Sequence, residues 1–520
     1  MRLVFAHYHW RPGGVRRVVE SSARAWAGDT QMAIDEVVFA GGEPPPPAWE
    51  NAMRALLAES KTRVSFISEA AFGYAAGWQG SPRELPGAAL QAARRVALTP
   101  ETLVVLENPA LGRNVGVAQA WVGACHTAGA RLLCRHHDFF FDARWERWPE
   151  IAAGGFAAWE DVLAAVFPTG PGVAHVSVSA RDAAWLHAAG LAESARESHW
   201  PNLAEVPDIT PEETEAARAW LHRVLGRAAP VWLLPCRLLR RKNIIEAAVL
   251  ARLLRPDAVL VTTGGPSSAA ETAYAEALAT MQRKSGGCWH LGALADVATD
   301  APRVPALMRA SERVLATSLF EGFGLPCREA AALGVPWLAR REALVDGGAA
   351  EGPPGATGAA IYDELRIDRA WIDWPAEKAR QQAAFARHRA LMPPAVAALL
   401  PEPPWWRNDA PVALSRLTLA GQSAVLERLH RWSPHEARAL FHPLNPWLQQ
   451  ATASAATPHP LPRETTAAHT ARLADFWENR EVTRADPPPA PSFPAALMAE
   501  RLAAFNHYPL LWPGGDGVAS

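Results

Sequence analysis

Two glutamates with seven residues between them, Glu321 and Glu329, flank a turn that contains Gly322 and Gly324. An apolar run precedes the turn, and Pro326 suits the first turn of a helix, so the segment predicts a strand, a tight turn and a helix start. The free N–H groups and the dipole of a helix start favour an anionic ligand. Because carboxylates accept hydrogen bonds from hydroxyls, the segment predicts a ligand that combines phosphates with sugar rings, such as a nucleotide sugar.

The run from Ser318 to Glu329 resembles the E-x7-E motif of family 4 glycosyltransferases, and the similarity continues to Pro336. The resemblance implies that Glu321 lies against the donor sugar and that Glu329 holds the ribose hydroxyls. It implies backbone contacts to sugar and phosphate from Gly322, Phe323, Gly324 and Leu325. A strand-turn-helix corner with two solvated glutamates is the structural alternative. The chain departs from the family at residues 336–340, which read Pro-Trp-Leu-Ala-Arg where relatives usually have P-V-V-A-S.

A basic loop follows the apolar run at residues 231–234. Cations at the carboxyl end of a parallel strand can neutralise a diphosphate leaving group. Arg237 and Lys242 resemble the R-x4-K pair with which the family binds the diphosphate, and Asn243 also fits. Only four of the 51 basic residues are lysines, which makes Lys242 more notable. A solvated basic loop is the alternative interpretation.

Small residues mark three further loops. Gly13 and Gly14 precede an expected helix and resemble the family's glycine loop over the donor diphosphate, although a plain turn would also explain them. Gly265 and Leu294 lie in loops that follow two expected strands of the second half of the chain. We predict that these loops also face the nucleotide.

The expected acceptor side follows a strand at residues 131–135, where His136, His137 and Asp138 come at the strand end. Many members of the family carry a strand-end H-D at this place, so His137 and Asp138 are the predicted acceptor-side residues. A metal site formed by these three residues with Asp142 is the alternative. It is disfavoured because adjacent side chains on a strand point in opposite directions.

Helical stretches alternate with expected strands, which lie at residues 3–6, 36–40, 63–67, 103–106, 131–135 and 175–179 in the first half and at 231–234, 258–262, 289–291 and 314–316 in the second. This alternation predicts an α/β fold with two doubly wound, Rossmann-like domains. The resemblance implies the GT-B architecture, in which two such domains face each other across a cleft. We predict an acceptor-side domain at 1–205, a nucleotide-sugar domain at 206–400 and a helical, proline-rich extension at 401–520. A capping box of Thr210 and Glu213 is expected near the first boundary. Helices at 465–479 and 494–506 are expected to pack back on the first domain.

Composition limits the class of protein. The chain has 520 residues, 49% of them hydrophobic and 20% charged, with a formal net charge of −2, so no general field for nucleic acid is expected. Its five cysteines form no C-x-x-C pair, and no apolar stretch approaches the roughly 18 to 20 residues of a membrane span. These features favour a cytoplasmic enzyme and are compatible with peripheral membrane association. They leave the oligomeric state open.

The combined expectation is a retaining glycosyltransferase that moves a hexose from a nucleoside diphosphate sugar to a hydroxyl acceptor. No D-x-D triplet occurs in the chain, so we predict a metal-independent reaction with no cofactor, and neither glutamate need act as a covalent nucleophile. The catalytic set predicted is Glu321, His137, Asp138, Arg237 and Lys242. Two alternatives are a nucleotide-sugar epimerase and a catalytically silent, nucleotide-sugar-binding partner in polysaccharide assembly.

Overall fold

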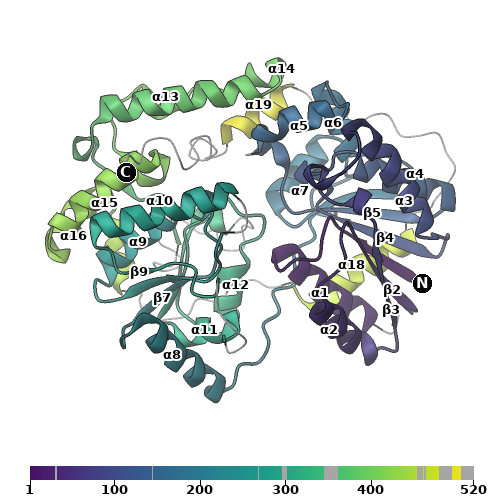
Figure 1. Ribbon diagram of the computed structural model, residues 1–520, viewed down its shortest axis with the longest axis horizontal. Coiled ribbons are helices and arrows are strands. Elements are labelled where there is room, and N and C mark those ends of the chain that lie inside the picture. Colours follow the sequence, from purple (N-terminus) through teal and green to yellow (C-terminus); the bar gives the residue numbers. More distant parts are fainter. Residues whose placement is uncertain are drawn as a thin grey trace. The chain divides into compact units, whose positions relative to one another are not determined.

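The computed structural model describes residues 1–29, 32–142, 144–266, 269–295, 301–344, 361–453, 461, 464–479, 493 and 495–504. The chain forms two compact units, each built on its own sheet (Figure 1). Unit 1 contains Met1–Leu203, Arg389–Leu400 and Glu464–Ala504. Unit 2 contains Ala204–His388 and Pro401–Arg463. Residues 401–463 therefore belong to unit 2, whereas the described residues from 464 to 504 belong to unit 1.

Unit 1 is built on a parallel six-stranded sheet with the order β3-β2-β1-β4-β5-β6. Its strands are β1 (Arg2–Ala6), β2 (Glu36–Gly41), β3 (Arg63–Ser68), β4 (Thr102–Glu107), β5 (Arg131–His136) and β6 (Val173–Ser177). The central strands β1 and β4 contain continuous apolar runs because helices cover both faces of the sheet. All six strands are predicted by the sequence, although β6 begins two residues before its expected start.

The described helices of unit 1 are α1 (Gly14–Ala27), α2 (Pro47–Ala58), α3 (Leu85–Arg95), α4 (Val117–Ala128), α5 (Trp148–Ala153), α6 (Trp159–Val166), α7 (Ala180–Ala188), α14 (Pro394–Ala397), α18 (Thr466–Asn479) and α19 (Ala495–Ala504). Helices α1, α2 and α18 pack on one face of the sheet, and α3 and α4 pack on the other. The C-terminal α18 lies on α1, where the ring of His469 stacks on Trp26 with centroids 5.0 Å apart. Leu473 of α18 joins the same core as Phe5 of β1.

Unit 2 is built on a second parallel six-stranded sheet with the order β12-β11-β10-β7-β8-β9. Its strands are β7 (Val231–Leu234), β8 (Val259–Thr262), β9 (Trp289–His290), β10 (Arg313–Ala316), β11 (Trp337–Arg340) and β12 (Ile361–Tyr362). Four of them are predicted by the sequence, while β11 and β12 are additional. A short antiparallel pair joins β13 (Arg366–Ile367) to β14 (Val412–Ala413).

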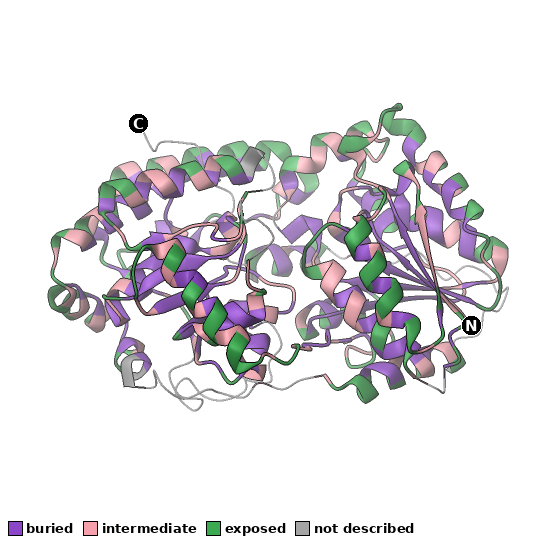
Figure 2. Ribbon diagram, turned by 60° about the horizontal axis from the view of Figure 1, so that its bottom comes forward, coloured by how far each residue is buried: buried purple, intermediate pink, exposed green. Residues whose placement is uncertain are grey.

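The helices of unit 2 are α8 (Pro211–Leu225), α9 (Ile244–Leu254), α10 (Ala269–Ser285), α11 (Val304–Ala310), α12 (Leu325–Ala332), α13 (Trp374–Leu391), α15 (Leu419–Arg431), α16 (Pro434–Phe441) and α17 (Trp447–Ala453). The predicted capping box at α8 is present, because Thr210 Oγ1 accepts from the Glu213 amide and the Glu213 carboxylate accepts from the Thr210 amide. In Figure 2 the strands are mostly buried and exposed residues line the outer faces of the helices. The predicted α/β class with two doubly wound domains is confirmed. No helix in the described part of the chain is both long and apolar enough to cross a membrane.

Candidate functional site

Three side chains converge on the carboxylate of Glu321 at the carboxyl ends of β7 and β10. Lys242 forms an ion pair with Glu321 Oε1, and Arg241 Nη1 lies 3.1 Å from Oε2. The Ser318 hydroxyl donates to Oε1 at 2.6 Å. The structure thus brings together Lys242 and Glu321, which are both predicted from the sequence. Arg241 and Ser318 are further members of this group that were not predicted, although Arg241 lies within the R-x4-K motif and Ser318 begins the run that contains the E-x7-E motif.

The charge of Glu321 is stabilised by these neighbours. Burial alone would raise the pKa of this carboxyl, but the cations of Lys242 and Arg241 outweigh that effect and lower the pKa to about 2. Glu321 is therefore ionised at neutral pH. An ionised carboxylate accepts hydrogen bonds from hydroxyls but cannot donate a proton, so it is suited to holding a sugar rather than to general acid catalysis.

The glycine turn between the two glutamates is sterically required. Gly324 has a φ of 75°, and a Cβ there would lie 2.2 Å from the carbonyl oxygen of Ala343. The turn leads into α12 at Leu325, and Glu329 is a buried residue of that helix. Phe323 is also buried, with the guanidinium of Arg328 4.3 Å from its ring centre. The strand, turn and helix start predicted for this segment are therefore present.

The two predicted diphosphate cations occupy different environments. Lys242 pairs with Glu321, as described, whereas Arg237 pairs with Glu271 at 3.2 Å and keeps half of its side chain exposed. Arg237 lies beside the loop that follows β8, because a Cβ on Gly264 would approach its Cγ to 2.9 Å. The R-x4-K spacing thus places one cation against α10 and the other against the E-x7-E turn.

The loops with Gly265 and Leu294 lie against each other. A Cβ on Gly265 would come within 2.6 Å of the Cβ of Ala295, so the close approach of the two loops requires glycine at this position. The Leu294 amide donates to the carbonyl of Thr263 at 2.8 Å. Both predicted loops therefore contribute to one surface at the carboxyl edge of the unit 2 sheet.

In unit 1, His137 and Asp138 also lie at the carboxyl edge of a sheet, with partners from the end of β4. His137 Nε2 is 2.7 Å from Glu107 Oε2, and Glu107 is fully buried. Asp138 accepts from Asn108 Nδ2 at 2.8 Å and from Arg144 at 2.6 Å. Glu107 and Asn108 were not predicted, although two polar residues directly after an apolar run are a usable signal.

The four residues of the alternative metal site have separate partners. His136 is buried and its Nε2 lies 3.0 Å from Nδ1 of His175, while His137 contacts Glu107. Asp142 forms a buried ion pair with Arg501 at 2.6 Å. Within the described residues, no group of three or more His, Cys, Asp or Glu side chains has the geometry to hold a metal ion.

The glycine pair at the start of α1 is less constrained than the other glycines of the site. Gly13 has an extended φ of 168°, and Gly14 is the first residue of the helix. A Cβ on Gly14 would meet no atom within 4 Å, so the fold of unit 1 does not itself require glycine there. The predicted donor contact of both residues stays a prediction. Gly13, Gly14, His137 and Asp138 belong to unit 1, whereas the residues around Glu321 belong to unit 2.

Comparison with known proteins gives distant similarities. No family model matches the chain. Mannosylglucosyl-3-phosphoglycerate synthase of Petrotoga mobilis is 25% identical over 227 residues, which is 42% of this chain and 42% of the length of that relative. The chain thus matches less than half of the length of this curated relative.

Solved structures with a similar fold have low sequence identity. HepE of Anabaena, crystallised with UDP and glucose, has a TM-score of 0.49 and 15% identity, covering 92% of this chain and all of that one. Sucrose-phosphate synthase of Thermosynechococcus elongatus has a TM-score of 0.47 and 16% identity, covering 88% of this chain and 96% of that one.

Proposed function

We propose that this chain is a glycosyltransferase that moves a hexose from a nucleoside diphosphate sugar to a hydroxyl acceptor, with retention at the anomeric carbon and without a divalent metal ion. One observation carries the proposal: an ionised Glu321 is held by Lys242 and Arg241 four residues before the first residue of α12. This arrangement combines a hydroxyl acceptor, cations and helix-start amides in one place. The sequence similarity to a mannosylglucosyl-3-phosphoglycerate synthase supports a glycosyl transfer.

The donor would bind to unit 2. In this proposal Glu321 accepts hydrogen bonds from the hexose and Glu329 from the ribose, while amides of residues 322–325 contact sugar and phosphate. Arg237 and Lys242 neutralise the diphosphate as the glycosidic bond breaks. The acceptor hydroxyl attacks from the face that the diphosphate leaves, and a leaving phosphate oxygen takes its proton. The protein then acts mainly by electrostatic preorganisation and orientation.

The acceptor would bind to unit 1, near His137 and Asp138. The Glu107 carboxylate fixes the ring of His137 at 2.7 Å, and Asn108 and Arg144 fix the carboxylate of Asp138. A histidine oriented in this way presents a defined ring face and nitrogen to a ligand. We therefore assign His137 to orienting the acceptor hydroxyl.

A donor screen tests the proposal. Thermal shift with UDP-, GDP- and ADP-sugars identifies the donor, because a ligand at a hundred times its Kd stabilises the protein by about 2.7 kcal/mol. Transfer or donor hydrolysis on the stabilising sugar is then measured. Release of an epimerised sugar would instead support the epimerase, and binding without turnover on any donor and acceptor mixture would support the silent partner. Stabilisation by none of the nucleotide sugars would contradict the proposal.

A further inference from the structure

Arg240 connects the basic loop of the site to a turn far along the chain. It is the first residue of the 3-10 turn η7 (Arg240–Lys242) and directly precedes the two cations that hold Glu321. Arg240 is 8% exposed, and its Nη2 donates to the carbonyls of Ser415 at 3.0 Å and Leu417 at 3.1 Å. Ser415 lies in the 3-10 turn η11 (Leu414–Arg416), and Leu417 directly follows this turn. A buried cation thus links the two turns.

The turn that receives Arg240 is held firmly by the rest of unit 2. Each of the four carbonyls from 414 to 417 accepts a hydrogen bond from a side chain. Besides the two bonds from Arg240, Gln422 donates to Leu414 at 3.0 Å and Gln381 donates to Arg416 at 3.2 Å. The carboxylate of Glu377 on α13 accepts from both the amide and the hydroxyl of Thr418, each at 2.6 Å. Arg240 therefore binds a turn whose own position is fixed.

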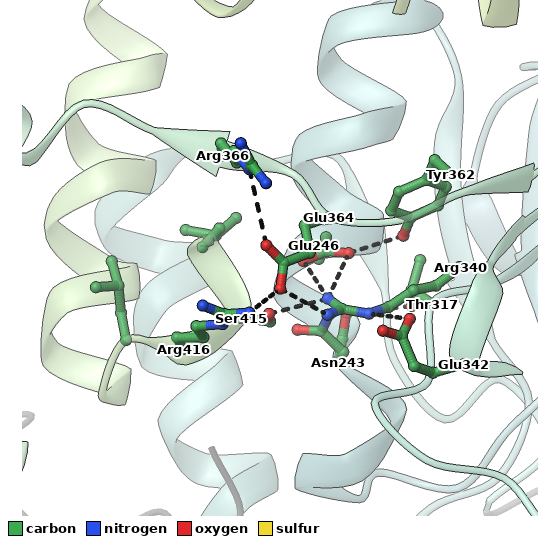
Figure 3. A network of polar contacts seen from close by, with 12 residues as sticks. Asn243, Glu246, Thr317, Arg340, Glu342, Tyr362, Glu364, Arg366, Ser415 and Arg416 are labelled. Atoms are coloured by element: carbon green, nitrogen blue, oxygen red, sulfur yellow. Dashed lines mark hydrogen bonds and ion pairs between the residues drawn. The ribbon is translucent and has the colours of Figure 1, made fainter. Parts of the chain in front are cut away.

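A second arginine fixes the same turn to the start of α9. Arg340, fully buried at the end of β11, donates to the Ser415 hydroxyl at 2.9 Å and to Glu342 at 2.9 Å. Its guanidinium also lies 3.4 Å from the carboxylate of Glu246, which accepts from the Tyr362 hydroxyl at 2.8 Å. Figure 3 shows Arg340 between these carboxylates and Ser415. Glu246 is in the first turn of α9, the helix that begins two residues after Lys242.

The basic loop is also anchored on its other side, at the end of β10. The Thr317 hydroxyl donates to the carbonyl of Lys242 at 2.9 Å, and the Leu319 amide donates to the carbonyl of Arg241 at 2.8 Å. The backbone of η7 is therefore held at β10, and the Arg240 side chain connects it to η11. Between these anchors, Arg241 and Lys242 extend to Glu321.

We propose that residues 412–418 form a positioning element for the donor site and that Arg240 is its positioning residue, which fixes η7 so that Lys242 can bind the donor diphosphate while Arg241 holds Glu321. The inference rests on the proposed function. It gives a role to a segment beyond residue 400 that no motif explains. Small displacements of such a loop are expected to matter, because a shift of about 1 Å can cost on the order of a hundredfold in rate.

The arrangement separates stability from function. The Nε and Nη1 atoms of Arg240 are buried and have no hydrogen-bond partner among the described residues. Removing Arg240 relieves the burial of an incompletely satisfied charge, but it leaves the carbonyls of Ser415 and Leu417 without their side-chain donor. Because these two effects oppose each other, Arg240→Met should change the thermal midpoint only modestly, while it weakens diphosphate binding.

The test compares Arg240→Met with the matched control Arg252→Met. Arg252 lies on α9 and also donates to a backbone carbonyl beyond residue 400, that of Trp432 at 3.1 Å, but it does not touch η7. Calorimetric titrations with UDP and UMP, with GDP and GMP, and with ADP and AMP measure the contribution of the second phosphate. We expect Arg240→Met to weaken diphosphate binding by about tenfold or more, with monophosphate binding retained and only a small change in thermal midpoint. We expect Arg252→Met to bind as the wild type does.

The outcomes are distinguishable. If the wild type binds none of the six nucleotides, the proposed function fails and not only the role of Arg240. If the wild type binds and Arg240→Met binds diphosphates equally well, the positioning role is overturned, whatever its thermal midpoint. If Arg240→Met does not fold, Arg240→Lys is measured instead, because it keeps the charge but loses the planar fork of the guanidinium. Weaker diphosphate binding by Arg240→Lys at the wild-type thermal midpoint would support the positioning role. Unchanged diphosphate binding would overturn it.

Discussion

The ion pair of Lys242 with Glu321 couples the two proposed halves of donor binding. One side chain is assigned to the diphosphate and the other to the hexose, yet they are in direct contact. Because residues in contact have non-additive energetics, removing either one should also disturb the function of the other. If Lys242 is removed, Glu321 keeps its contacts with the Arg241 guanidinium and the Ser318 hydroxyl.

Lys242→Ala should lower kcat/KM for transfer by about 100- to 1000-fold, equivalent to roughly 3 to 4 kcal/mol, which is the scale of one preorganised donor. The physical reason is the loss of a cation that stabilises the leaving diphosphate. Steady-state kinetics with the donor found in the screen measure the change in kcat/KM. Lys284→Ala on α10, an exposed lysine of the same unit, is the control. An unchanged kcat/KM for Lys242→Ala would remove Lys242 from the mechanism.

His137→Gln should lower kcat by about tenfold to a hundredfold while the Kd of the nucleotide sugar stays unchanged. The reason is that His137 is assigned to the acceptor and lies in unit 1, whereas Glu321 and Lys242, which are assigned to the hexose and the diphosphate, lie in unit 2. Transfer kinetics measure kcat, and titration with the nucleotide sugar measures its Kd. His126→Gln, an exposed histidine of α4, is the control. A weaker donor Kd with normal kcat would contradict the acceptor-side assignment.

The residues of the site were partly predictable because some signals are local in sequence and others depend on strand order. Glu321 and Lys242 lie in motifs whose spacing is short, so the sequence identified both. Glu107 was missed because its proximity to His137 depends on β4 lying next to β5 in the sheet. Such adjacency follows from the topology of the sheet, which the spacing of residues along the chain does not specify.

At the scale of elements, α19 is attached to unit 1 by a buried ionic cluster. Arg501 contacts Asp142 at 2.6 Å and Asp182 at 2.9 Å, and all three side chains are almost fully buried. The guanidinium also lies 4.5 Å from the ring centre of Phe139. Helices near these positions were expected from sequence, but the arginine anchor was not, because its carboxylate partners lie more than three hundred residues away.

Arg501→Met should destabilise unit 1 by about 3 to 5 kcal/mol, because it leaves Asp142 and Asp182 buried without their shared cation. Chemical denaturation followed by tryptophan fluorescence measures the change, since Trp185 lies beside the cluster with its ring centre 5.3 Å from the guanidinium. The matched control is Arg472→Met on α18, where a partly exposed pair with Glu464 at 3.0 Å should contribute less than about 1 kcal/mol. Equal effects of the two substitutions would show that the cluster does not anchor α19.

At the scale of the whole molecule, the two units are not two contiguous stretches of chain. Residues 389–400 and 464–504 return to unit 1 after the chain has formed most of unit 2. The repeated strand-helix pattern predicted two sheets because hydrophobic periodicity is local. The return of the later segments depends on long-range contacts such as the stacking of His469 on Trp26. Neither unit can therefore be isolated by cutting the chain once.

Buried histidines make the stability of the molecule depend on pH. Burial lowers the pKa of His7 in unit 1 to about 4, and it likewise lowers the pKa of His388 in unit 2 to about 4. The unfolded chain protonates such groups near pH 6.5, whereas the folded chain keeps them neutral. The unfolded state then binds more protons between about pH 6.5 and pH 4, so each group lowers stability as the pH falls through that range.

His388→Gln isolates this effect, because burial is the sole cause of the lowered pKa at His388. The free energy of unfolding of the wild type should fall more steeply than that of the variant between pH 6.5 and pH 4, by up to about 1.4 kcal/mol for each pH unit. Urea denaturation at pH 7, 6 and 5 measures both curves. Above pH 7 the two should run parallel, since His388 is neutral in both the folded and the unfolded chain. If the wild-type and variant curves also run parallel down to pH 5, His388 is protonated equally in the folded and the unfolded chain. The burial of His388 in α13 would then make no contribution to the loss of stability in acid.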